Sequence, residues 1–108
     1  MATQAEINSI FPQMMDNFQA DKAGDLNATI AFELSGDNGG NYWVKIDNGA
    51  VTHGDGETDA DMTVKAAADD FYQIATGGMN PMQAFMAGKI KVTDMSLGMK
   101  MMSIFQLG

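Results

Sequence analysis

The chain has 108 residues, 45% of them apolar, and a net charge of −8 with six lysines and no arginine. This length and apolar content predict one globular domain over residues 1–108 and exclude a disordered chain. The acidic charge argues against a nucleic-acid partner, because binding a phosphate backbone needs clustered positive charge, and the lack of cysteine excludes disulfides and thiol catalysis.

The first expected element is an amphipathic helix that begins after Thr3. Thr3 and Glu6 have the spacing of a capping box, in which each side chain accepts a hydrogen bond from the other residue's backbone amide. Pro12 falls on the face opposite the apolar one, where it should kink or divide the helix. Residues 20–24 are expected to form a linker. The apolar face recurs at helical spacing and consists of Ile7, Ile10, Phe11, Met14, Met15 and Phe18.

Four strands are expected next, because the apolar period changes from helical spacing to two. The inward faces are expected to hold Ile30, Phe32 and Leu34, then Tyr42, Val44 and Ile46, and finally Met62 and Val64, with a third strand over residues 50–53. Asn48-Gly49 is a strong hairpin signal, since both central residues of that turn need positive φ. We expect successive hairpins to join the four strands into an antiparallel meander.

The remaining elements are two short helices, a fifth strand and a final helix. Residues 68–76 return to helical spacing, and Asn80-Pro81 offers an N-cap followed by proline at the first helical position. Residues 89–92 alternate as a strand, and Thr93 or Asp94 is expected to cap the last helix. This order predicts an α+β fold in which helices cover a mostly antiparallel five-stranded sheet.

The final helix, expected between Met95 and Leu107, is apolar over most of its circumference, whereas a surface helix needs one apolar stripe. The protein's own core, a partner or a bound lipid could cover the surplus. The chain also holds eleven methionines, which suit either a soft core or a wall that repacks around varied apolar shapes.

Candidate polar chemistry is sparse. Residues 55–61 alternate acidic side chains but lack the glycine and glutamate of a calcium loop, so they are interpreted as a solvated acidic turn. His53 stands beside Gly54 and Asp55 in no motif that would make it a base or a ligand, which argues against a catalytic role. We therefore expect no metal, no cofactor and no catalysis. Lys89, Lys91 and Lys100 could meet phosphate groups or a lipid surface, although lysines on a strand more often face water.

Several stretches closely resemble the sterol carrier protein type 2 family. They are Ala60-Asp-Met-Thr-Val, Ala68-Asp-Asp-Phe, Thr76-Gly-Gly-Met-Asn-Pro-Met-Gln-Ala-Phe-Met-Ala-Gly-Lys-Ile-Lys-Val92 and Leu97-Gly-Met-Lys-Met101. The chain departs from the family pattern in a Val92–Met95 turn about one residue shorter and in Gly98, where the family usually has alanine.

This resemblance implies a sheet covered on one face by helices that enclose a hydrophobic tunnel, closed by the C-terminal helix. It implies non-enzymatic binding and transfer of fatty acids, fatty acyl-coenzyme A, sterols or phospholipids. Gln83 would lie near the ligand head group. The expected ligand-contacting residues are Phe32, Phe71, Ile74, Met82, Gln83, Phe85, Met86, Ile90, Leu97, Met101, Met102 and Phe105.

The sequence leaves a second function open, in which the methionine-rich C-terminal helix is a protein–protein interaction or dimerisation surface. A cytoplasmic location is expected, because no secretory signal and no run of 18 apolar residues is visible. A monomer is expected, and the sequence leaves a dimer and transient membrane contact open.

Overall fold

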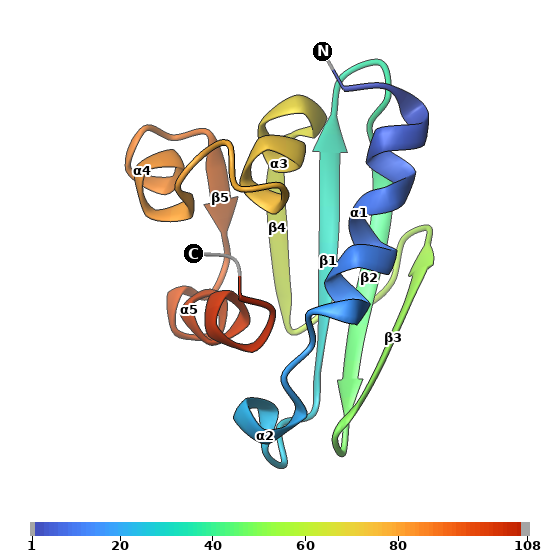
Figure 1. Cartoon of the computed structure of the whole chain (residues 1–108), viewed down its shortest axis with the longest axis vertical. Helices are drawn as coiled ribbons and strands as arrows, with labels where there is room; N and C mark the ends of the chain where they lie inside the picture. The colour runs from blue at the N-terminus through green and yellow to red at the C-terminus, as the bar shows by residue number, and fades with distance from the viewer. Residues whose placement is uncertain (1, 107–108) are drawn as a thin grey trace.

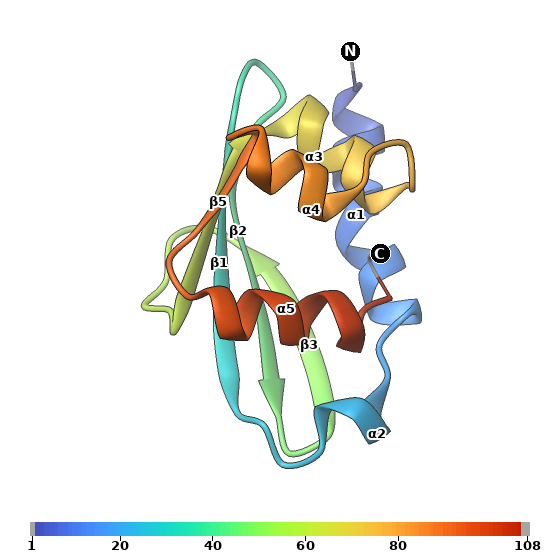
Figure 2. The same ribbon diagram turned by 90° about the vertical axis from the view of Figure 1, so that its left-hand side faces the viewer.

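The fold has two layers, a five-stranded sheet and the helices that cover one of its faces (Figures 1 and 2). The computed structural model describes residues 2–106. Its helices are α1 (Gln4–Asp16), α2 (Ala20–Ala23), α3 (Ala68–Ala75), α4 (Pro81–Met86) and α5 (Met95–Ile104). Its strands are β1 (Ala28–Ser35), β2 (Gly40–Asp47), β3 (Ala50–Asp55), β4 (Met62–Ala67) and β5 (Ile90–Val92). The expected α+β class and the five strands are confirmed, and the expected linker contains the short helix α2.

The expected meander is wrong at its last step. The sheet order is β3-β2-β1-β4-β5, and β4 pairs with β1 in parallel instead of with β3. The other three pairings are antiparallel, so the sheet is mixed but mostly antiparallel. The central strand β1 alternates buried and more exposed residues, and pairing on both sides satisfies the backbone groups of this apolar strand.

Residues 56–61 carry the chain from one edge of the sheet to the far side of β1. They cross the face that has no helices, as Figure 2 shows. When extended they reach at most about 20 Å, which is enough for the roughly 14 Å between these strands. Asp61 fixes the position at which this segment reaches β1. Its amide donates to the Thr29 carbonyl at 2.8 Å, and its carboxylate accepts from the Thr29 amide at 2.8 Å. One acid of the expected solvated turn therefore sets the start of β4.

Helix α1 begins at the expected capping box. Glu6 N donates to Thr3 Oγ1 at 3.1 Å, and Thr3 N donates to the Glu6 carboxylate at 2.9 Å. Pro12 does not divide the helix, which continues to Asp16. The proline is exposed, so the carbonyl that lacks its usual amide donor faces the solvent side, where water can replace the bond.

The core lies between the sheet and the helices. The inward residues of β1, β2 and β4 pack against α1, α3 and α5, and the side chains of Phe105, Ile7, Ile10 and Ile30 are fully buried. Within residues 2–106, no helix combines the length and the apolar character that crossing a bilayer requires.

Candidate ligand-binding site

An apolar cavity of about 80 Å³ lies between the sheet and helices α3, α4 and α5. Nineteen residues line it, and seven of them are methionines, whose flexible side chains make the wall adaptable. The lining residues are Met14, Ile30, Phe32, Val44, Met62, Val64, Phe71, Ile74, Pro81, Met82, Phe85, Ile90, Val92, Met95, Gly98, Met99, Met101, Met102 and Phe105.

The floor of the cavity is the inward face of the sheet. Ile30 pairs with Val44 on one side and with Met62 on the other, and each of these three side chains is at least 98% buried. In the next inward row Phe32 pairs with Val64. Because side chains alternate along a strand, residues two apart share this face. The residues that the period-two pattern places on the inward face therefore form the floor of the cavity.

Aromatic rings close the side of the cavity that faces α1 and α3. The ring centroids of Phe32 and Phe71 are 5.3 Å apart, and those of Phe11 and Phe32 are also 5.3 Å apart in an edge-to-face arrangement. Tilted and edge-to-face pairs at this distance are the favoured geometries for aromatic contacts. These rings are a fixed boundary beside the softer methionine wall.

Helix α4 starts where the sequence indicated. The Asn80 side chain accepts from the amides of Met82 and Gln83 at 2.9 and 3.2 Å, and Pro81 occupies the first helical position. Gly88 then ends the helical segment with φ +76°, which turns the chain into β5. Ala84 and Pro81 pack inward, whereas Met82 and Met86 are exposed.

The short Val92–Met95 turn holds the start of α5 against the sheet. Thr93 continues the pairing with β4, because its amide donates to the Thr63 carbonyl at 3.2 Å and its hydroxyl accepts from the Thr63 amide at 3.0 Å. Asp94 then caps α5 by accepting from the Leu97 amide at 3.0 Å. Of the two expected caps, Asp94 is the one used.

The other end of α5 is also attached. The Gln19 amide donates to the Ile104 carbonyl at 2.8 Å, and the ring centroids of Phe18 and Phe105 lie 5.6 Å apart. Along the helix, Leu97, Met101 and Ile104 face the core. The expected helix extended to Leu107, which lies outside the described residues.

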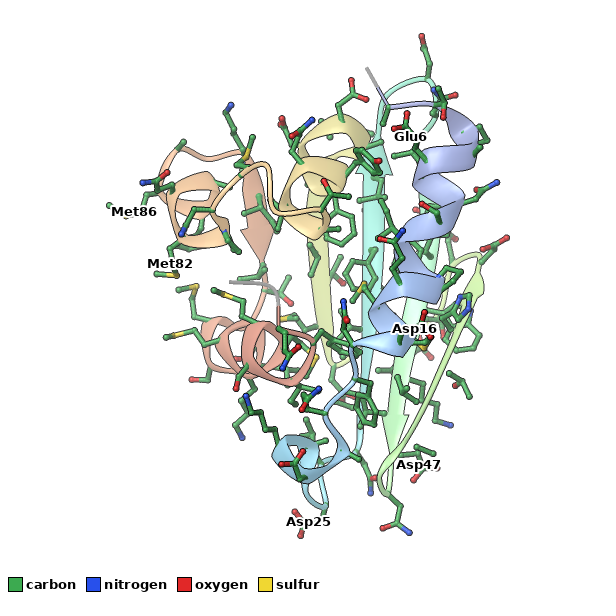
Figure 3. The ribbon with its side chains drawn as sticks, viewed as in Figure 1. Glu6, Asp16, Asp25, Asp47, Met82 and Met86 are labelled. Carbon is green, nitrogen blue, oxygen red and sulfur yellow. The ribbon has the colours of Figure 1, made fainter. Side chains whose placement is uncertain are left out.

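The cavity opens between α4 and α5. Three of its lining residues are exposed to solvent: Met82 at 39%, Met95 at 42% and Met99 at 55%. Figure 3 shows Met82 on the side of α4 that faces α5. We call the region around Met82, Met95 and Met99 the mouth. The final helix has more apolar side chains than one stripe requires, and they lie partly in the core and partly at this mouth.

The lining contains no ionisable, amide or hydroxyl side chain among the described residues. His53 is exposed and stacks on Phe11, with ring centroids 6.3 Å apart, away from the cavity. The two resolved electrostatic shifts lie elsewhere: hydrogen bonds from Thr3 and Tyr72 lower the pKa of Glu6, and the hydrogen bond to Glu6 raises the pKa of Tyr72. The cavity can exclude water and hold apolar groups, and its lining within residues 2–106 offers no acid, base or nucleophile.

Nine of the twelve residues expected from the sequence line this cavity, so the fold does bring them together. They are Phe32, Phe71, Ile74, Met82, Phe85, Ile90, Met101, Met102 and Phe105. The other three do not line it: Gln83 is exposed, Met86 is 82% exposed and Leu97 is buried in the core. Contact with a ligand stays a prediction for all twelve.

Ten further lining residues were not in the expected set, and two signals could have found most of them. Ile30, Val44, Met62 and Val64 lie on the inward faces that the period of two identifies. Met95 and Met99 lie one turn apart, on the face of α5 that also carries Met102. Met14 comes from α1, and its role as wall depends on tertiary packing.

Comparison with known proteins gives this cavity a family context. The sequence matches the SCP-2 sterol transfer family over residues 7–106. The chain belongs to the SCP-2 sterol transfer family. This membership assigns the chain to lipid binding and transfer in general.

Solved structures share the fold of this SCP-2 family chain. It superposes on sterol carrier protein 2 like 2 from Aedes aegypti with a TM-score of 0.71 and 16% identity, covering 93% of this chain and 96% of that one. The palmitated form of that protein gives a TM-score of 0.72 at 18% identity, covering 97% and 95% of the two chains. A double mutant of the sec-alkyl sulfatase PisA1 gives 0.76 at 24% identity, over 93% of this chain and 16% of that one.

Curated relatives of the SCP-2 family chain are much longer. Hydroxysteroid dehydrogenase-like protein 2 from Bos taurus is 30% identical over 103 residues, which cover 93% of this chain and 25% of that protein. The Homo sapiens protein of the same name is 32% identical over 98 residues, covering 88% and 23%. The chain thus spans about a quarter of the length of these relatives.

Proposed function

We propose that this chain binds the acyl chain of a lipid in its apolar cavity and transfers that lipid without catalysis. The observation that carries the proposal is the cavity itself, which is lined by apolar residues throughout and opens at a methionine-rich mouth. Family membership supports lipid binding in general. The absence of acids, bases and nucleophiles from the lining, among the described residues, supports a carrier over an enzyme.

The cavity has to enlarge to take such a ligand. Pockets that bind small molecules usually measure about 300–1,000 Å³, several times the 80 Å³ present here. Methionine side chains are unbranched and flexible, so their rotation can open space without moving strands. Met82, Met95, Met99 and Met102 lie on the two helices that flank the mouth, which makes this wall the part best suited to yield.

An acyl chain fits the lining better than a sterol does. Transfer of roughly a dozen methylenes at about 0.8 kcal/mol each favours binding by about 10 kcal/mol before the costs of association. A sterol hydroxyl buried without a partner costs about 1–3 kcal/mol, and the described lining has no side chain to accept or donate its hydrogen bond. We therefore propose that the tail enters and that the head group stays at the mouth.

Helix α5 is proposed to close the cavity as a wall fixed at both ends. The hydrogen bonds of Thr93, just before the helix, to Thr63 and the bond from Gln19 to Ile104 support this role. Passage of the ligand would then occur between α5 and α4. A monomeric state and a cytoplasmic location stay predictions from the sequence.

Titration with a fluorescent fatty acid and with a fluorescent sterol tests the proposal. We expect saturable one-to-one binding of the fatty acid and weaker binding of the sterol. Native mass spectrometry of the purified protein should show masses with added acyl chains. A protein that takes up neither probe would overturn the carrier function, and equal binding of the two would overturn the preference for acyl chains.

A second candidate function is an interaction module, and the exposed methionines of α4 and α5 favour it. In this case the methionine-rich surface would bind a partner protein or a second copy of the chain. Sedimentation equilibrium over a wide concentration range checks whether two copies of the chain associate. A monomer at all concentrations would contradict self-association.

A further inference from the structure

The methionines of the cavity wall differ widely in their access to solvent. The three at the mouth, Met82, Met95 and Met99, are 39%, 42% and 55% exposed. Three others line the same cavity but are at most 7% exposed, and these are Met14, Met62 and Met101. A reagent that attacks thioethers from solution therefore reaches the sulfur atoms at the mouth before those in the interior.

Methionine is the sulfur-containing residue that an oxidant meets in this protein, because the chain has no cysteine. Hydrogen peroxide oxidises a thioether by two electrons. The sulfur lone pair attacks one peroxide oxygen, an S–O bond forms as the O–O bond breaks, and the other oxygen leaves as water after proton transfer. The product, methionine sulfoxide, is polar where the thioether was apolar.

A sulfoxide at the mouth changes what the cavity can hold. Its oxygen is a hydrogen-bond acceptor, and water satisfies it as long as no ligand covers it. The lining within residues 2–106 has no ionisable, amide or hydroxyl side chain. An acyl chain that covers the sulfoxide therefore displaces the water and leaves the oxygen without a donor. Each sulfoxide covered in this way should weaken binding about 5- to 150-fold.

We propose that Met82, Met95 and Met99 form an oxidation site that controls lipid loading: as thioethers they admit an acyl chain, and as sulfoxides they exclude it. This proposal rests on the proposed carrier function and adds a regulation of the same site, with a peroxide as the modifying reagent. A methionine sulfoxide reductase reverses the change. It uses two thiols, which become a disulfide as the sulfoxide oxygen leaves as water. The three residues lie on the two helices that flank the mouth, so the change occurs where the ligand enters.

Met86 provides a control within the same molecule. It belongs to α4 and is 82% exposed, but it does not line the cavity. Figure 3 shows it projecting from the left-hand edge of the molecule. Its sulfoxide would stay in water whether or not a ligand is bound. Met86 should therefore be oxidised readily without any effect on loading.

Brief treatment with hydrogen peroxide, followed by peptide mass spectrometry, tests the site. Without fatty acid we expect sulfoxide at Met86 and at the three mouth positions before it forms at Met14, Met62 or Met101. A saturating fatty acid should slow oxidation at the mouth and leave the rate at Met86 unchanged. Oxidation of the buried methionines as fast as those at the mouth would overturn the proposal, and so would equal protection of Met86 and the mouth.

Fatty-acid binding before and after peroxide tests the control of loading. The treated protein should bind a fluorescent fatty acid at least about fivefold more weakly, and a sulfoxide reductase with dithiothreitol should restore its affinity. A triple variant, Met82→Leu with Met95→Leu and Met99→Leu, keeps apolar side chains of similar volume that have no sulfur. Its affinity should be the same before and after peroxide, whereas Met86→Leu should show the full loss. Equal losses in the two variants would overturn the proposal.

The carrier function and the oxidation site fail in different ways. If the protein binds fatty acid equally well with thioethers and with sulfoxides at the mouth, the oxidation site is overturned and the carrier function stands. If the untreated protein binds no fatty acid, the carrier function is overturned and the control of loading with it. Urea unfolding of the treated protein completes the test. A loss of binding that accompanies unfolding would overturn the proposal, because general destabilisation would then replace a polar mouth as its cause.

Discussion

Gly98 lies inside helix α5 and also lines the cavity, so a substitution there affects both the stability of the helix and the shape of the cavity. A Cβ added there would come within 3.6 Å of Val92 and 3.8 Å of the Met62 sulfur, which are ordinary contact distances. Since glycine inside a helix is less stable than alanine by about 0.5–1 kcal/mol, we expect Gly98→Ala to raise the free energy of unfolding by that amount. Urea denaturation measures the change.

Gly88→Ala is the matched control for this substitution. Gly88 has φ +76°, where an alanine is strained by about 1–2 kcal/mol. The same chemical change should therefore destabilise the protein at position 88. Equal effects at positions 88 and 98 would contradict the account of Gly98 as an unstrained helical residue in the cavity wall.

Met99 and Met101 show how one helix divides between the mouth and the core. Both line the cavity, but Met99 is 55% exposed and Met101 is 7% exposed. Met101→Asp buries an unpaired charge and should cost about 3–5 kcal/mol. Met99→Asp places its charge in water and should change stability by less than about 0.5 kcal/mol, while repelling the carboxylate of a fatty acid at the mouth.

Thermal unfolding and fatty-acid titration of the two variants check this division. If Met99→Asp binds fatty acid as the unmodified protein does, the mouth does not lie beside Met99. The sequence alone could not separate these residues, because both are methionines on one helix and only tertiary packing determines which is covered.

At the scale of elements, the capping box of α1 makes stability depend on pH. Hydrogen bonds from Thr3 and from the Tyr72 side chain of α3 lower the pKa of Glu6 below its ordinary 4.5. The carboxylate is therefore favoured in the folded state. Its contribution is present above pH 4.5 and is lost as the pH falls through the lowered folded pKa.

We expect Glu6→Gln to lower stability at about pH 7, with the difference from the unmodified protein shrinking toward about pH 3. Urea unfolding at the two pH values measures it, and Glu57→Gln in the exposed β3–β4 connection is the control. A difference that does not vary with pH would contradict the role of the Glu6 charge.

Local signals in the sequence predicted the elements well where they depend on neighbouring residues. The capping box at Thr3, the Asn48-Gly49 turn and the Asn80-Pro81 start of α4 all act within a few residues, and each is present in the structure. The partner of β4 depends on residues far apart. Period-two spacing shows which face of β4 is inward but not which strand it joins, and the contact between Asp61 and Thr29 has no local pattern.

At the scale of the whole molecule, the sheet supplies a rigid floor and the helices supply a wall that can yield. The floor residues Ile30, Val44 and Met62 are almost completely buried in paired strands, whereas α4 has only six residues and exposes Met82 and Met86. The resemblance predicted a sheet covered on one face by helices that enclose an apolar space. It could not predict the cavity's small volume or the position of its mouth, since both depend on side-chain packing between helices.

A series of saturated fatty acids of increasing length tests how far this wall yields. Each methylene that enters an apolar cavity adds about 0.8 kcal/mol, which is about fourfold in affinity. We expect the logarithm of affinity, measured by displacement of a fluorescent fatty acid, to rise linearly with chain length and then to level off where the enlarged cavity is full. Gly98→Ala adds a methyl group to the wall and should move this plateau to a shorter chain. An affinity independent of chain length would show that the tail does not enter the cavity. A rise without a plateau would contradict a closed cavity, because a closed space with a fixed sheet floor can accept only a limited number of methylenes.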